Sequence, residues 1–232
     1  MRLAIMQPYL FPYLGYYALV GQVDRFVFLD DVRYIKQGWI NRNRWMVGLE
    51  PQYFTVPAQG IGEFSRINEV SVPKDTTWRR KLLATLKQSY SQAPRTAEVL
   101  RLFRDVLEGD SDAISGMAKR SVVAVAQSMG MQASFVMSST IYENDALAGE
   151  DRVLDICRRE GATEYVNLPG GLALYDPARF AAHGVALRFV APWVRAYPRG
   201  AGAPMPHLSV LDALMFNEPQ ILRTLIDEES LA

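Results

Sequence analysis

The chain has 232 residues, with 25 basic and 25 acidic side chains and therefore a formal charge of zero, and 49% of its residues are hydrophobic. This length and apolar content suit one α/β domain with a real core and exclude a disordered chain. Zero net charge gives no support for binding to nucleic acid or to an anionic membrane, and a single cysteine excludes a disulfide framework and a multi-thiolate zinc site.

The N-terminal residues predict a strand, a helix and a second strand. Residues 3–6 and 26–29 are short apolar runs typical of buried strands, and residues 12–22 carry apolar side chains at helical spacing. Two strands joined by one helix within about 30 residues indicate a parallel crossover.

Residues 33–72 break this rhythm and predict an inserted, hairpin-rich region. Its strand-like runs are residues 45–47, 52–56 and 67–72. Residues 75–130 then predict a helical segment. The helices expected there cover residues 77–90, 96–107 and 111–129, with Thr76 or Thr77 as the cap of the first.

Alternation of strands and helices resumes after the helical segment. Strands are expected at residues 134–137, 164–166 and 185–190, helices at residues 151–160 and 172–183, and two C-terminal helices at residues 208–231, parted near Asn217. Five strand candidates alternating with helices predict an α/β fold with a doubly wound, mostly parallel five-stranded sheet of Rossmann-like or HUP-like type. We expect residues 1–232 to form one domain.

Net neutrality hides an uneven distribution of charge. Residues 1–48 carry six basic and three acidic side chains, whereas residues 204–232 carry one basic and five acidic side chains. The densest polar and aromatic stretch holds Lys36, Trp39, Asn41, Arg42 and Arg44. Such a mixture suits a phosphate group together with a sugar or base stacked on the indole. The alternative is an exposed hairpin with solvated charges and one packed tryptophan.

Polar or glycine-rich residues follow most of the expected strands, at the edge where open α/β sheets bind ligands. They are Gln7 and Tyr9, Asp30 and Asp31, Ser138 to Thr140, and Asn167 with Gly170 and Gly171. The amides of Gln7 and Asn167 can read hydrogen-bonding groups. A helix that opens at Gly170-Gly171 would offer free N–H groups to an anion, and a plain turn with a helix cap is the alternative.

Few side chains are available for acid–base chemistry. Asp30 is the best candidate for a general base, because it follows the second strand, and His207 is a second candidate for a base or a phosphate contact, a structural cap being the alternative. Cys157 lies among apolar residues and predicts a buried thiol. No spacing of His, Cys and carboxylates predicts a metal site, and the adjacent carboxylates of Asp30 and Asp31 point in different directions, which disfavours Mg²⁺.

The segment from Tyr13 to Tyr16 follows the first expected strand, where nucleotidyltransferases and class I aminoacyl-tRNA synthetases place an H-x-G-H motif. Residues 138–141 resemble the phosphate loop of the same superfamily. Because Tyr13 and Tyr16 stand where those enzymes have histidines, the comparison favours a shared nucleotide-binding fold over shared catalysis. Packing of the tyrosines in a helix is the alternative.

Long blocks of the chain closely resemble the WbqC-like protein family. They read MQPYLFPYLGYYALV, FVFLDDVRYIKQGWINRNRW, PQYFTVP, LKQSYSQAP, EYVNLPGGLALYD and LSVLDALMF, and they span residues 6–216. The resemblance implies a bacterial protein associated with gene clusters for O-antigen, capsule and related polysaccharides, and it implies no particular reaction.

These patterns together lead us to expect a cytoplasmic transferase that acts on a nucleotide-activated sugar or a similar phosphate-bearing precursor. The superfamily comparison indicates acyl or aminoacyl transfer as the type of reaction. A non-catalytic nucleotide- or glycan-binding accessory protein is the alternative. The expected partner is a small molecule, with no nucleic acid and no membrane insertion. No cofactor and no oligomeric state follow from the sequence.

Overall fold

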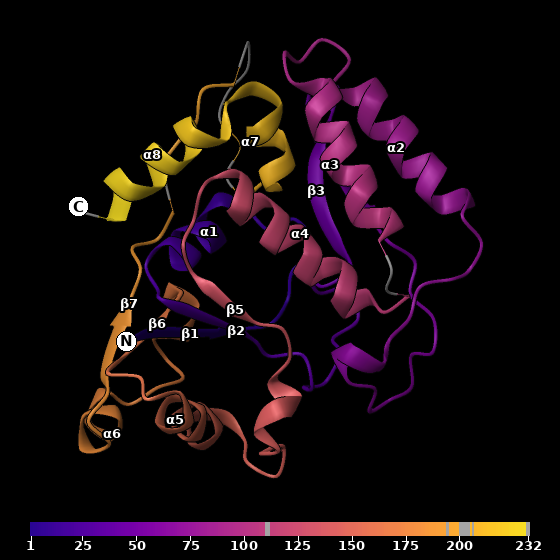
Figure 1. Ribbon diagram of the computed structural model, residues 1–232. Helices are drawn as coiled ribbons and strands as arrows, with labels where there is room; N and C mark the ends of the chain where they lie inside the picture. Colours follow the sequence, from indigo (N-terminus) through magenta and orange to yellow (C-terminus); the bar gives the residue numbers. More distant parts are fainter. Residues whose placement is uncertain (110–111, 194, 200–204, 206, 231–232) are drawn as a thin grey trace.

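The computed structural model describes residues 1–109, 112–193, 195–199, 205 and 207–230 (Figure 1). Its strands are β1 (Arg2–Met6), β2 (Arg25–Phe28), β3 (Arg42–Val47), β4 (Glu50–Thr55), β5 (Ser134–Val136), β6 (Glu164–Asn167) and β7 (Ala186–Phe189). Its α-helices are α1 (Leu14–Gly21), α2 (Thr77–Ser89), α3 (Thr96–Glu108), α4 (Ile114–Ser128), α5 (Gly149–Glu160), α6 (Pro177–Ala182), α7 (Val210–Phe216) and α8 (Pro219–Ser230).

Five strands form one parallel sheet in the order β5-β2-β1-β6-β7, which confirms the predicted Rossmann-like α/β fold. The chain passes from β1 to β2 on one side, and later places β6 on the other side of β1. The strand order therefore reverses at β1. In an open α/β sheet such a reversal is the topological switch point, where the crossovers part and leave a crevice beyond the strand ends.

Helices cover both faces of this sheet. Within β1, Leu3 and Ile5 pack into one apolar cluster with α5 and α6, whereas Ala4 packs into another cluster with α1, α4 and α8. Figure 1 shows these two groups of helices on opposite sides of the strands. Burial on both faces explains why the strands read as apolar runs and lack the alternation of a half-exposed sheet. None of the described helices combines the length and apolarity needed to span a membrane.

The inserted region contains an antiparallel hairpin of β3 and β4. Its two-residue loop begins with Gly48, whose φ of 62° favours glycine. Trp45 stacks on Phe54 across the hairpin with ring centroids 4.2 Å apart, and Phe103 of α3 packs edge-on against both rings. The hairpin is thus attached to the helical segment through a shared aromatic core.

Two predicted elements differ in the structure. Residues 67–72 form no strand: Ile67–Glu69 is a 3₁₀ turn, and Ser71 makes only isolated bridges. The backbone there pairs with the segment after β2, since Asn68 N donates to Asp30 O. The helix expected at residues 172–183 is shortened to α6, because Asp176 caps it through a bond to Ala178 N. Residues 111 and 231, which were expected in helices, lie outside the described residues.

Asn43 of β3 joins the hairpin to the loop between β1 and α1. Its buried Nδ2 donates to Leu10 O at 3.0 Å and to Phe11 O at 2.8 Å, while its Oδ1 accepts from Arg44 N. The amide therefore satisfies two buried carbonyl groups in a loop that has no ladder partner of its own.

We predict that Asn43→Ala lowers the free energy of unfolding by about 1–3 kcal/mol, because it removes the donor from the buried Leu10 carbonyl and leaves Phe11 O with the Ser209 hydroxyl alone. Urea unfolding measures the change. Gln52→Ala, at an exposed position on β4 of the same hairpin, is the control and should change stability by less than about 0.5 kcal/mol. Equal effects of the two substitutions would contradict this role for Asn43.

Candidate functional site

A cavity of about 770 Å³ opens at the carboxyl ends of β1 and β6. It lies at the switch point of the sheet, where the fold separates the crossovers on the two sides of β1. Its lining comes from the ends of β1 and β6, the first turn of α1, the insertion, the segments after β2, β6 and β7, and the residues before α7. The lining residues are Ile5, Met6, Gln7, Tyr9, Pro12, Tyr13, Gly15, Leu29, Ile35, Trp39, Asn43, Asn167, Leu168, Pro169, Gly170, Gly171, Leu174, Tyr175, Ala191, Pro192, Trp193 and His207.

The described lining contains aromatic rings, aliphatic groups and three side-chain amides, with His207 as its one ionisable group other than tyrosine. Predominantly apolar walls with a few placed polar groups are typical of small-molecule sites. The cavity can therefore bury an uncharged part of a ligand and hold it by hydrogen bonds.

Asn167, the last residue of β6, is held in a fixed orientation. Its Nδ2 donates to the hydroxyl of Tyr165 at 3.1 Å, and its Oδ1 accepts from Leu168 N at 2.7 Å. Gly171 makes room for this amide, since a Cβ there would lie 2.8 Å from Asn167 Nδ2. Pro169–Gly171 is a 3₁₀ turn, so the predicted helix start at Gly170-Gly171 is wrong and α6 begins later, at Pro177.

The tyrosines after β1 take different positions. Tyr9 and Tyr13 line the cavity, whereas Tyr16 is fully buried and its hydroxyl donates to Gln7 O at 2.9 Å. Burial raises the pKa of the Tyr9 and Tyr13 hydroxyls above the usual value, so both remain neutral donors at physiological pH. Tyr16 thus orients the backbone of Gln7, and Gln7 itself lines the cavity.

Gly15 brings the first turn of α1 to the cavity wall. A Cβ at this position would lie 2.8 Å from Cβ of Trp193 and 2.3 Å from the ring of Tyr13, so only glycine allows this packing. Because Gly15 and Trp193 both line the cavity, the first turn of α1 faces the same space as the indole of Trp193. The first N–H groups of a helix have no acceptor within it and favour negative charge.

Cations lie beside the cavity, near Trp39. The guanidinium of Arg44 is 5.9 Å from the Trp39 ring centroid, and that of Arg42 is 4.4 Å from the Tyr53 centroid, which in turn is 6.2 Å from Trp39. Lys36 is exposed in the same loop. Arg42 and Arg44 thus lie outside the described lining, around a tryptophan that is part of it.

His207 lies at the exposed margin of the cavity. Its ring packs edge-on against Tyr13 at 5.1 Å, and its carbonyl accepts from Arg44 Nη2 at 3.4 Å. The backbone at His207 has a φ of 60°, which costs a residue with a Cβ about 1–3 kcal/mol and is characteristic of functional sites. The imidazole is therefore open to solvent and borders the cavity.

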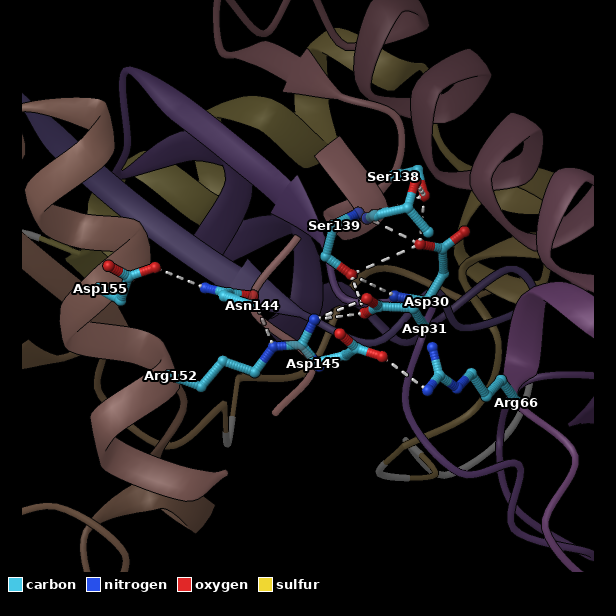
Figure 2. A network of polar contacts seen from close by, with 10 residues as sticks. Asp30, Asp31, Arg66, Ser138, Ser139, Asn144, Asp145, Arg152 and Asp155 are labelled. Carbon is cyan, nitrogen blue, oxygen red and sulfur yellow. Dashed lines mark hydrogen bonds and ion pairs between the residues drawn. The ribbon is translucent and has the colours of Figure 1, made fainter. Parts of the chain in front are cut away.

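Asp30 and Asp31 lie outside the cavity lining and hold the sheet edge at β2 and β5. Asp30 is paired with Lys119 of α4 and accepts from Ser138 Oγ at 2.7 Å and Ser139 N at 3.2 Å. Asp31 accepts two hydrogen bonds from Arg152 Nη2 of α5, at 2.7 and 2.6 Å. Figure 2 shows the two carboxylates meeting partners from different elements.

This network also occupies the serines that resemble a phosphate loop. Ser138 and Ser139 donate their hydroxyls to the two aspartates, and Arg152 Nε continues the network to Asn144 Oδ1 at 2.9 Å. Because every one of these side chains is bonded to another protein group, we interpret the cluster as a support for the sheet edge.

The match to known proteins covers nearly the whole site. A model of the WbqC-like protein family matches residues 7–224, a range that contains every lining residue except Ile5 and Met6. The chain belongs to the WbqC-like protein family. It is also 29% identical, over 219 residues and 93% of each chain, to the uncharacterized protein Rv1507c of Mycobacterium tuberculosis (strain ATCC 25618 / H37Rv). No solved structure matches the chain significantly.

In this member of the WbqC-like family, the cavity brings together about half of the predicted site residues. Those in the lining are Gln7, Tyr9, Tyr13, Trp39, Asn167, Gly170, Gly171 and His207. Those outside it are Tyr16, Asp30, Asp31, Lys36, Asn41, Arg42 and Arg44. Asn41 is buried and fixes the insertion by bonds to Tyr34 and to Val56 O.

Asn43, Tyr175 and Trp193 line the cavity but are not among the predicted site residues. Asn43 lies inside the polar stretch 36–44 but carries no charge to single it out, and Tyr175 lies in a segment that was expected to be helical. Trp193 follows a predicted strand, which is the one signal for it in the sequence. Its contact with the Gly15 position depends on two segments that are far apart in the chain.

We predict that Asp31→Asn lowers the free energy of unfolding by about 3–5 kcal/mol, because it leaves the buried guanidinium of Arg152 without its counter-charge. Chemical denaturation measures the loss. The control is Asp24→Asn, which breaks the ion pair between Asp24 and Arg2. Both side chains of this pair are about half exposed, so the substitution should lower the free energy of unfolding by less than about 1 kcal/mol. A loss as small as that of Asp24→Asn would contradict a supporting role for Asp31.

Proposed function

We propose that this WbqC-like protein is a transferase that binds a nucleotide-activated sugar, or a similar phosphate-bearing precursor, in the switch-point cavity. One observation carries the proposal: a cavity lined by aromatic rings and amides lies at the switch point, and cations lie beside it. A ligand with an uncharged planar or cyclic part and a charged phosphate matches this arrangement, in which the cavity is uncharged and the cations lie outside it.

The uncharged part of the ligand belongs inside the cavity. Sugar rings and bases pack well on Trp39, Tyr9 and Trp193, and the amides of Gln7 and Asn167 can pair with hydroxyl, amide or carbonyl groups. A charged phosphate buried there without a counter-ion would be costly, because the described lining offers no cation except a protonated His207.

The phosphate belongs beside Trp39, next to Arg44 and Arg42, and the exposed Lys36 lies three positions before Trp39 in the chain. A guanidinium binds two phosphate oxygens through parallel N–H donors. The Nε of Arg42 and that of Arg44 are buried and have no hydrogen-bond partner in the described part of the chain, so both guanidinium groups keep unused donors. Because these Nε atoms are closed to solvent, a phosphate would bond to the Nη groups of the two guanidinium ions.

His207 is the acid–base group in this proposal, and Asp30 is not, since its carboxylate is paired with Lys119. In an acyl or aminoacyl transfer, the acceptor amine or hydroxyl attacks the carbonyl carbon of an acyl phosphate. A new C–N or C–O bond forms, the bond to the phosphate oxygen breaks, and the imidazole takes the acceptor's proton. The phosphate leaves as an anion beside the arginines.

A binding protein without catalysis is the second candidate, and one observation favours it. The described lining holds no carboxylate and no thiol, and burial raises the pKa of Cys157, which lies elsewhere, to about 12. A role in polysaccharide assembly suits either candidate, because such pathways use nucleotide-activated sugars.

We predict that calorimetric titration with UMP, UDP-glucose and CMP detects binding of at least one of them, and that Arg44→Ala weakens it by about tenfold, the loss of one charge-assisted contact. Arg101→Ala, at an exposed position on α3, is the matched control and should leave the affinity unchanged. No binding of any probe would contradict the proposed function, and equal losses in both variants would remove Arg44 from the site.

We predict that His207→Gln retains probe binding but loses turnover by about 100-fold or more, since glutamine hydrogen-bonds without accepting a proton at neutral pH. Single-turnover assays with acyl-phosphate and nucleotide-sugar donors measure this step. Binding by the parent protein without turnover of any donor would favour the accessory role.

A further inference from the structure

Asp212 of α7 is a fully buried carboxylate that the proposed chemistry does not use. Its Oδ1 accepts from the hydroxyl of Tyr90 at 2.6 Å, and its Oδ2 accepts from the hydroxyl of Tyr197 at 2.7 Å. Arg199 Nε donates to both oxygens, at 3.2 and 2.9 Å. A buried charge with this many donors joins the segments that supply them.

Two of the three donors come from one irregular segment, residues 191–193 and 195–199, which we call the cavity strap. It begins after β7, where Ala191, Pro192 and Trp193 form part of the cavity wall. Its far end is fastened by Tyr197 and Arg199 to Asp212, and Pro198 O accepts from Asn217 Nδ2 at 2.7 Å. The strap therefore runs from the cavity to the carboxylate.

The link between the two ends is short. Trp193 and Tyr197 are four positions apart, which spans at most about 14 Å of extended chain. Trp193 is buried against the first turn of α1, where the missing Cβ of Gly15 makes space for it. Within this link, Arg195 pairs with Glu228 of α8 at 2.7 Å, but both side chains are exposed and such a pair holds a segment weakly. A shift at Tyr197 would therefore reach Trp193 over few bonds.

We propose that Asp212 is a positioning residue for the cavity: it fixes the strap through Tyr197 and Arg199, and it thereby sets the place of Trp193 in the cavity wall. The effect on ligand affinity rests on the proposed function, whereas the effect on Trp193 does not. Burial, and to a smaller extent the nearby carboxylate, raises the pKa of both tyrosine hydroxyls well above the usual value, so each remains a donor.

His207 is held independently of the strap. The neighbouring residues bond directly to other elements, since Ser209 N donates to Arg44 O at 2.9 Å and Val210 N donates to Pro12 O at 3.0 Å. Loss of a strap anchor should therefore displace Trp193 and leave the imidazole in place.

Tyr90 provides a matched control on the same carboxylate. Its hydroxyl also accepts from Met46 N of β3 at 3.0 Å, so it connects Asp212 to the hairpin and not to the strap. Tyr90→Phe and Tyr197→Phe each remove one hydroxyl from Asp212 with the same change of volume. They differ in the segment that is released.

The test is fluorine NMR of protein labelled with 5-fluorotryptophan, with the resonance of Trp193 assigned from Trp193→Phe. We expect Tyr197→Phe to shift or broaden the Trp193 resonance and to leave that of Trp45, on the hairpin, in place. We expect Tyr90→Phe to do the reverse. With UMP as the probe, Tyr197→Phe should raise Kd by about threefold to tenfold, and the single-turnover rate with a saturating donor should change little.

An unchanged Trp193 resonance in folded Tyr197→Phe, or an equal shift of that resonance in Tyr90→Phe, would overturn the proposal. Arg199→Lys, which keeps the charge but loses the guanidinium Nε–H that bonds both oxygens, is a second variant and should act like Tyr197→Phe. If no nucleotide binds the parent protein, the proposed function fails, and the fluorine spectra still decide whether Asp212 positions Trp193.

Discussion

The architecture depends on β1 being paired on both sides and covered on both faces. β2 and β6 flank it, and helices lie above and below, so the backbone of β1 is closed to a ligand except at its carboxyl end. The chain leaves toward β2 on one side and returns at β6 on the other. This reversal leaves a crevice at Gln7 and Asn167, and segments from several other parts of the chain form its walls.

The sheet edge beside this crevice is held by two successive buried aspartates. Neighbouring residues in an extended segment point to opposite sides, so Asp30 reaches Lys119 of α4 and Asp31 reaches Arg152 of α5. Helices on the two faces are thereby fastened to the end of β2, next to Leu29 in the cavity lining. Buried ion pairs add little net stability, but removing one partner is costly. Their value here lies in fixing the relative position of two helical layers.

Much of the fold follows from the sequence, because apolar runs and helical spacing are local patterns. The five sheet strands and the hairpin insertion were predictable on that basis. The strand predicted at residues 67–72 does not form, since Ile67 and Asn68 pair their backbone with residues after β2 and make no ladder. Local composition carries no information about such long-range pairing.

The candidate site was predictable in part for the same reason. Gln7 and Asn167 follow strands of a parallel sheet, so their edge could be inferred from topology alone. Asp30 follows a strand as well, yet its partners Lys119 and Ser138 are about 90 and 110 residues away along the chain, and only the fold brings them together. Trp193 and Gly15 are a second example, because this part of the cavity wall depends on a contact between two segments that are distant in the chain.

The central claim is that the switch-point cavity is the ligand site. The most direct measurement is a titration of isotopically labelled protein with UMP and UDP-glucose, followed through the side-chain amide resonances of asparagine and glutamine. We predict saturable shifts for Gln7, Asn43 and Asn167, and none for the exposed Gln127 on α4. Shifts confined to amides outside the cavity, such as Asn144 beside Arg152, would contradict the account.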